Sequence, residues 1–175
     1  MRGPGSDVRE HVVVTAQLRR PPRVPWRVAV HCPFDYPAVI ATPPRLADGT
    51  PFPTLFWLSC PRLVARIGGL ESAGGIAAWV ERLAAEDDLA ARVLLADAAY
   101  RVARQSEGGG DDPCADVGVA GLREPLKTKC LHAHAAAALA GIDDPIGTDS
   151  VERAGGWCEA DECAQLDAVA QEATA

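Results

Sequence analysis

The residues best suited to chemistry in this sequence are its cysteines and histidines. Cysteine occurs six times, at positions 32, 60, 114, 130, 158 and 163. Thiols stay unpaired in a reducing compartment, so a chain with this many cysteines indicates metal binding or thiol chemistry rather than three disulfides. No two cysteines form a Cys-x-x-Cys pair, so the spacing alone does not define a zinc knuckle.

Four of the cysteines stand at the ends of expected elements or in the tail, where distant segments can converge. Cys60 precedes a helix that starts at Pro61, and Cys130 lies in the first turn of a later helix. Helix N-termini carry partial positive charge and favour the thiolate, which is the form that binds a metal. We expect a zinc ion or an iron–sulfur cluster on four thiolates. The expected ligands are Cys32, Cys60, Cys130 and Cys158, with His134, His132 and Cys163 as alternatives.

A thiol-dependent enzyme is the second hypothesis. Cys130 and His134 are four residues apart on the expected helix, so they share a face and can act as nucleophile and base. His132 lies about 200° around the same helix from Cys130. A single nucleophile leaves the other cysteines unexplained, which favours the metal hypothesis.

The elements that must position these residues change character along the chain. Alternating, β-branched runs predict strands at 26–31, 38–42 and 54–58. Helical periodicity then begins at Pro61 and predicts further helices at 76–85, 89–105 and 128–139, with a turn at 143–149. The fold class is therefore α+β, with a small antiparallel sheet in the N-terminal third followed by a helical C-terminal part.

The expected organisation is one domain with two flanking segments. Residues 1–23 form a flexible N-terminal segment or a short helix at 8–18, and residues 24–150 form the single α+β domain. Residues 151–175 form a tail with a short helix from Asp161. The chain has 175 residues, which suits one domain with its own core.

Composition limits the partners and the compartment. The net charge is −7, which disfavours nucleic acid because such binding needs clustered positive charge. No run approaches the roughly 18 apolar residues of a membrane span, and no signal-peptide pattern is present. We expect a cytoplasmic protein, with a protein partner left open.

Several stretches resemble a known bacterial family. They are HCPFDYPAVI at 31–40, PFPTLFWLSCP at 51–61, Leu70-Glu71-Ser72, KCLHAH at 129–134 and DPIG at 144–147. The chain resembles the family catalogued as domain of unknown function 501, over roughly residues 8–150. The resemblance implies no particular reaction, but its cysteine- and histidine-centred motifs imply that Cys32, Cys60, Cys130 and His132 or His134 belong to one site.

The resemblance also implies a third hypothesis. Members are associated with genes for a septum-formation protein and an exopolyphosphatase, which suggests a non-catalytic regulatory or interaction module linked to cell division or polyphosphate metabolism. The alanine content and the preference for arginine over lysine indicate a GC-rich genome, as in actinobacteria.

Overall fold

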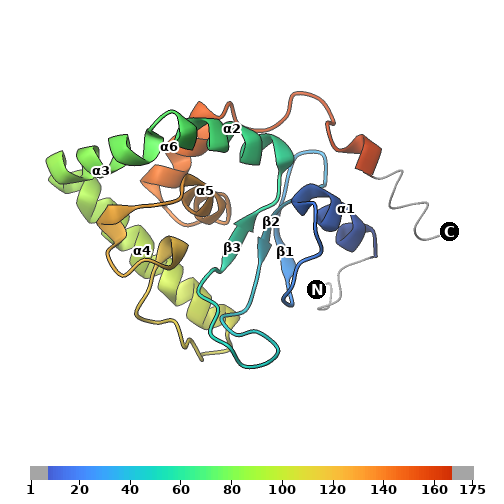
Figure 1. Cartoon of the computed structure of the whole chain (residues 1–175), viewed down its shortest axis with the longest axis horizontal. Coiled ribbons are helices and arrows are strands. Elements are labelled where there is room, and N and C mark those ends of the chain that lie inside the picture. Colours follow the sequence, from blue (N-terminus) through green and yellow to red (C-terminus); the bar gives the residue numbers. More distant parts are fainter. Residues whose placement is uncertain (1–7, 167–175) are drawn as a thin grey trace.

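A three-stranded antiparallel sheet forms one side of the molecule, and helices pack on it (Figure 1). The computed structural model describes residues 8–166. The strands are β1 (Arg27–His31), β2 (Pro37–Ala41) and β3 (Phe56–Leu58), in the order β1-β2-β3. All of β2 is buried, as expected for a central strand. The predicted α+β class is confirmed, with the sheet in the N-terminal part.

Helices make up most of the chain after the sheet. They are α2 (Pro61–Ser72), α3 (Gly75–Ala85), α4 (Asp87–Glu107), α5 (Leu131–Leu139) and α6 (Pro145–Arg153). Two short 3₁₀ helices, η1 (Val119–Gly121) and η2 (Pro125–Lys127), precede α5. An N-terminal helix, α1 (Val8–Leu18), packs against β2. Of the two alternatives given for this segment, a flexible stretch or a short helix at 8–18, the structure has the helix.

Helix α5 lies at the centre of the helical part, between the sheet and helices α2 and α6 (Figure 1). Its alanines at 135–137 have no exposed surface, and such small side chains let neighbouring backbones come close. The closest neighbour is α6, where a Cβ atom added at Gly147 would lie 2.1 Å from the carbonyl oxygen of His134. Helix α5 is therefore fixed tightly in the core, and its N-terminus is fixed with it.

The prediction of a turn at 143–149 was wrong, because α6 begins there. The Asp144 carboxylate accepts hydrogen bonds from the backbone N–H groups of Ile146 and Gly147, which makes it the N-cap of α6. Pro145 occupies the first helical position, where its missing N–H costs nothing. Both features are start signals for a helix.

The segment between α4 and α5 is held by one buried cation. The guanidinium of Arg104, which has no exposed surface, pairs with Asp112 at 2.9 Å. It also donates hydrogen bonds to the carbonyl oxygens of Pro53, Cys114 and Val117, at 3.1, 2.6 and 2.7 Å. This network fixes the segment before α5 against the strand connection near Pro53.

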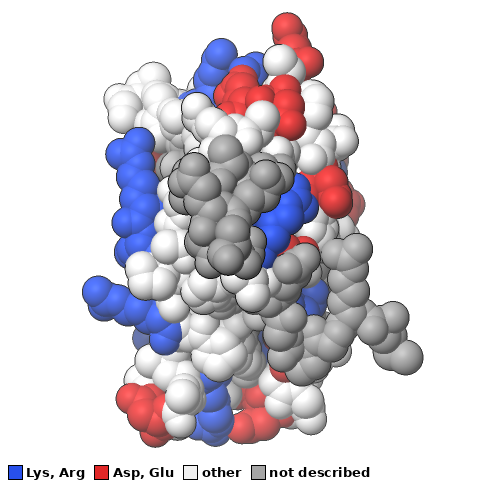
Figure 2. All heavy atoms as spheres, turned by 90° about the vertical axis from the view of Figure 1, so that its right-hand side faces the viewer, with Lys and Arg blue, Asp and Glu red and all other residues white. Residues whose placement is uncertain are grey.

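The described helices include none with the length and apolar character needed to cross a membrane. The face that carries α1 shows both basic and acidic side chains, without a broad surface of one sign among the visible atoms (Figure 2).

Candidate functional site

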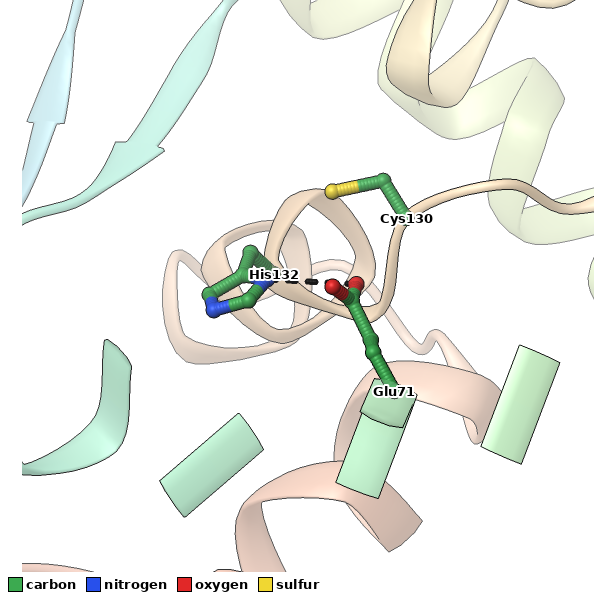
Figure 3. Close-up of side chains that lie close together, drawn as sticks. All are labelled: Glu71, Cys130 and His132. Atoms are coloured by element: carbon green, nitrogen blue, oxygen red, sulfur yellow. Dashed lines mark ion pairs between the residues drawn. The ribbon is translucent and has the colours of Figure 1, made fainter. Parts of the chain in front are cut away.

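Helices α2 and α5 bring the side chains of Glu71, Cys130 and His132 together (Figure 3). Glu71 lies in the last turn of α2. Cys130 is the N-cap residue of α5 and has an extended backbone, with φ −153° and ψ 107°. His132 is the second residue of α5. One carboxylate oxygen, the Cys130 sulfur and one ring nitrogen all lie within 4.8 Å of one another.

Glu71 holds this arrangement by capping α5 from the neighbouring helix. Its Oε1 atom accepts a hydrogen bond from the backbone N–H of Leu131 at 2.6 Å, while the Cys130 side chain makes no capping bond. A carboxylate at a helix N-terminus is stabilised by the free N–H groups and the helix dipole. The same Oε1 atom lies 3.2 Å from Nδ1 of His132, so the cap also orients the imidazole.

The two nitrogens of His132 face groups that only accept hydrogen bonds. Nε2 lies 3.0 Å from the carbonyl oxygen of Val64 in α2, so this nitrogen carries a hydrogen. Nδ1 faces the Glu71 carboxylate, so in the metal-free protein it carries a hydrogen as well. A hydrogen bond with Cys130 raises the pKa of His132 to about 9, with help from the Val64 carbonyl and the Glu71 charge and against the effect of burial.

Cys130 and His132 also border a cavity of about 290 Å³. Strand β3 and the segment before it contribute Thr54 and residues 56–58 to its lining. Lys129, an exposed residue, also lines it, together with Ala120 and Ala133. The site therefore borders a space large enough for a small molecule, and a cation lines that space.

A comparison with protein-family models assigns the chain to a family. A family model described as protein of unknown function (DUF501) matches residues 28–152. The chain belongs to the DUF501 family. The match confirms the resemblance found in the sequence, and its range contains Glu71, Cys130 and His132 but ends before Cys158. No curated protein matches the chain, and no solved structure does.

The structure does not bring together the four cysteines that were predicted as one ligand set. In the described part of the DUF501 chain, only Glu71, Cys130 and His132 form a group of three or more metal-ligand atoms within 4.8 Å. Cys130 thus has an acid and an imidazole beside it in place of three other thiols. Metal binding by the predicted set stays a prediction that no observation here tests.

The remaining three predicted cysteines lie near the other end of α2, together with the alternative ligand Cys163. Cys158 and Cys163 line one cavity with Pro61, the residue after Cys60. Cys32 packs against the apolar cluster that contains Cys163 and against the main core, which contains Cys60. These four residues are here called the four-thiol group (Cys32, Cys60, Cys158 and Cys163). Burial raises the pKa of the Cys60 thiol to about 11.

His134, the predicted catalytic base, has a different partner. It is buried, and its Nδ1 lies 2.6 Å from Oδ2 of Asp144, the N-cap of α6. The Cys130 sulfur lies within 4.8 Å of a ring nitrogen of His132 instead. The helical-face argument that paired Cys130 with His134 was wrong in one step: Cys130 precedes α5 with extended backbone, so its direction does not follow the helical repeat.

Glu71 is the functional residue that sequence reasoning missed. Its stretch, Leu70-Glu71-Ser72, supported the family resemblance, but no role followed from it. Val64 and Glu71 are two helical turns apart and so share a face of α2, and this face meets His132. No local pattern announces that contact, because the partner lies in a distant helix.

Proposed function

We propose that this protein binds a divalent metal ion of the zinc class through Glu71, Cys130 and His132. The observation that carries the proposal is the convergence of a carboxylate oxygen, a thiol sulfur and a ring nitrogen within 4.8 Å. Zinc accepts all three donor types. The ion would take the place of the proton that Nδ1 of His132 carries in the metal-free protein.

The surroundings of His132 support this role. A metal-binding histidine commonly donates its other N–H to a backbone carbonyl, which fixes the ring and its tautomer. The hydrogen bond from Nε2 of His132 to the Val64 carbonyl, 3.0 Å long, is a contact of this kind. It directs Nδ1 toward the other two donors.

The number of ligands indicates what such an ion could do. Three protein ligands leave a fourth position of a zinc ion for water or a substrate, as in catalytic zinc sites. The adjoining cavity of about 290 Å³ lies on the side of Cys130 and His132. A zinc ion held by these residues would lower the pKa of a bound water to about 7, and it would supply hydrolytic chemistry for a small substrate. Lys129 at the cavity favours an anionic one.

We propose a cytoplasmic location for the protein, which the six free cysteines support because thiols stay reduced there.

Thiol chemistry at Cys130 is the second candidate function. The proximity of the Cys130 sulfur to a ring nitrogen of His132, within 4.8 Å, favours it, because a protonated imidazole stabilises a neighbouring thiolate. In this alternative His132 acts as a fixed cation and not as a base, since both of its nitrogens already donate to acceptors. A substrate would then react with the sulfur directly.

Cobalt(II) titration of the chelator-treated full chain tests the first proposal. Cobalt bound to a thiolate gives an absorption band. One equivalent of cobalt should give this band in the unmodified chain, and Cys130→Ser and His132→Gln should each lose it. Cys114→Ala is the matched control, because Cys114 belongs neither to the site of Glu71, Cys130 and His132 nor to the four-thiol group.

Alkylation of Cys130 separates the two candidates. If the metal proposal holds, zinc slows the reaction of Cys130 with iodoacetamide, followed by mass spectrometry. Fast alkylation that zinc does not change, with no cobalt band assigned to Cys130, would overturn the metal proposal in favour of thiol chemistry.

A further inference from the structure

Three separate parts of the chain supply the four-thiol group. Cys32 directly follows β1, and Cys60 is the N-cap residue of α2. Cys158 and Cys163 lie on the segment that follows α6. This segment runs back across the molecule to the side of the sheet and α1 (Figure 1).

Specific contacts hold the C-terminal segment at the start of α2. Arg62 in the first turn of α2 pairs with Glu162 at 2.8 Å. Tyr36 donates a hydrogen bond to Asp161 at 3.3 Å. Cys158 and Cys163 line a cavity of about 290 Å³ together with Pro61, the residue next to Cys60. The polar contacts therefore hold the segment that carries both C-terminal thiols beside the start of α2, next to Cys60.

Cys32 joins the group from the other side. Cys163 is buried against Val13 and Tyr36, and Cys32 packs against the same apolar cluster. The Cys32 backbone is fixed by the N–H bond that it donates to the Tyr36 carbonyl at 2.9 Å. Apolar neighbours thus cover one side of the four-thiol group and limit its access to water.

A hydrogen-bond donor also points at one of the sulfurs. The Gln17 side chain donates to the Cys163 sulfur at 4.0 Å. N–H donors of this kind stabilise negative charge on sulfur, and they tune the potential of sulfur-bound metal centres.

A single zinc ion and an iron–sulfur cluster require different separations between their four cysteine sulfurs. Four sulfurs around one zinc ion lie about 3.8 Å apart, since each Zn–S bond is about 2.3 Å long in a tetrahedron. Among the described residues, no three of these thiols meet even the wider limit of 4.8 Å. An iron–sulfur cluster has several iron atoms and so needs more widely spaced ligands.

We propose that Cys32, Cys60, Cys158 and Cys163 hold an iron–sulfur cluster. The ligand set differs from the one expected from the sequence, because Cys163 takes the place of Cys130. The cluster would lie at the opposite end of α2 from Glu71, and its ligands are separate from those of the metal site proposed above.

Protein purified without oxygen tests this proposal. The full-length chain should show broad visible absorption, with iron and acid-labile sulfide in equal amounts. Cys158→Ser and Cys163→Ser should each lose that absorption and the iron, also after reconstitution of the metal-free protein with iron and sulfide. Cys130→Ala and Cys114→Ala are the matched controls, and both should keep them. Circular dichroism of each metal-free variant verifies that it is folded.

Other outcomes would overturn the proposal. A colourless protein with one zinc ion, lost in Cys163→Ser, would identify a zinc site in place of a cluster. Iron that survives Cys163→Ser but not Cys130→Ala would restore the ligand set expected from the sequence. Absence of iron after reconstitution would exclude the cluster. The Glu71 site is tested separately, by measuring cobalt binding to the Cys158→Ser variant, which keeps Glu71, Cys130 and His132. Absence of cobalt binding to this variant would contradict the Glu71 site without bearing on the cluster.

Discussion

The imidazole of His132 donates its Nε2 hydrogen to the Val64 carbonyl at 3.0 Å, and this contact turns Nδ1 toward Glu71 and Cys130. The histidine comes from α5 and the carbonyl from α2, so the ring joins two helices. The orientation of the site is thus set by a backbone group, which no side-chain substitution at Val64 removes.

Glu71→Gln tests the carboxylate as a ligand. Glutamine keeps an oxygen that can accept the Leu131 N–H bond, now 2.6 Å long, so the cap of α5 and the fold should persist. The lost charge should weaken cobalt or zinc binding by at least about tenfold. Glu81→Gln, on the exposed surface of α3, is the control and should leave the affinity unchanged. Equal affinity for both variants would show that Glu71 is only a cap.

Gly147→Ala should destabilise the fold. A Cβ atom at this position would lie 2.1 Å from the His134 carbonyl oxygen and 2.7 Å from Ala138 Cβ, so α6 must move away from α5. We expect a loss of about 2–4 kcal/mol in the free energy of unfolding, measured by urea denaturation. Gly69→Ala has nothing within 4 Å of the new atom and should be neutral or gain up to about 1 kcal/mol.

Arg104→Met should be among the most damaging substitutions in the chain. Methionine fills part of the space but leaves the Asp112 carboxylate and three backbone carbonyls without their buried donor. Removing one partner of a buried ion pair costs about 3–5 kcal/mol. Thermal unfolding should show this loss, whereas Arg92→Met, at an exposed pair with Asp143, should change stability by no more than about 1 kcal/mol. A similar small change in both variants would contradict the role of Arg104.

Asp144 has two functions that two substitutions can separate. Asparagine keeps an oxygen for the Ile146 and Gly147 N–H groups, at 3.0 and 3.1 Å, but loses the charge beside His134. Alanine removes both. Losing an N-cap costs about 1 kcal/mol, so Asp144→Ala should unfold at lower urea concentration than Asp144→Asn. Equal midpoints would show that the cap contributes little.

The sequence predicted the elements better than it predicted their contacts. Alternation located the strands, and Pro61 marked the start of α2 as found. Helix α6 was missed although Asp144 and Pro145 carry its start signal. Asp, Pro and Gly, which stand at 144, 145 and 147, are also frequent turn residues, so composition alone did not separate a turn at 143–149 from a helix start.

The site was predictable only in part, because its geometry depends on where one helix begins. Cys130 and His132 were both candidates, but their pairing required Cys130 to lie outside α5. A boundary shift of a few residues is common in sequence-based assignment, and here it decides which histidine meets the thiol. Glu71 required the packing of α2 on α5, which a single sequence does not encode locally.

Helix α2 is bordered by Cys60 at its start and carries Glu71 in its last turn. Its 12 residues form one unbroken rod, about 18 Å long at 1.5 Å per residue. Helix α2 therefore supplies one residue to each of the two proposed sites. A tilt of α2 that widened the space around Cys60 would also change the distance between Glu71 and α5.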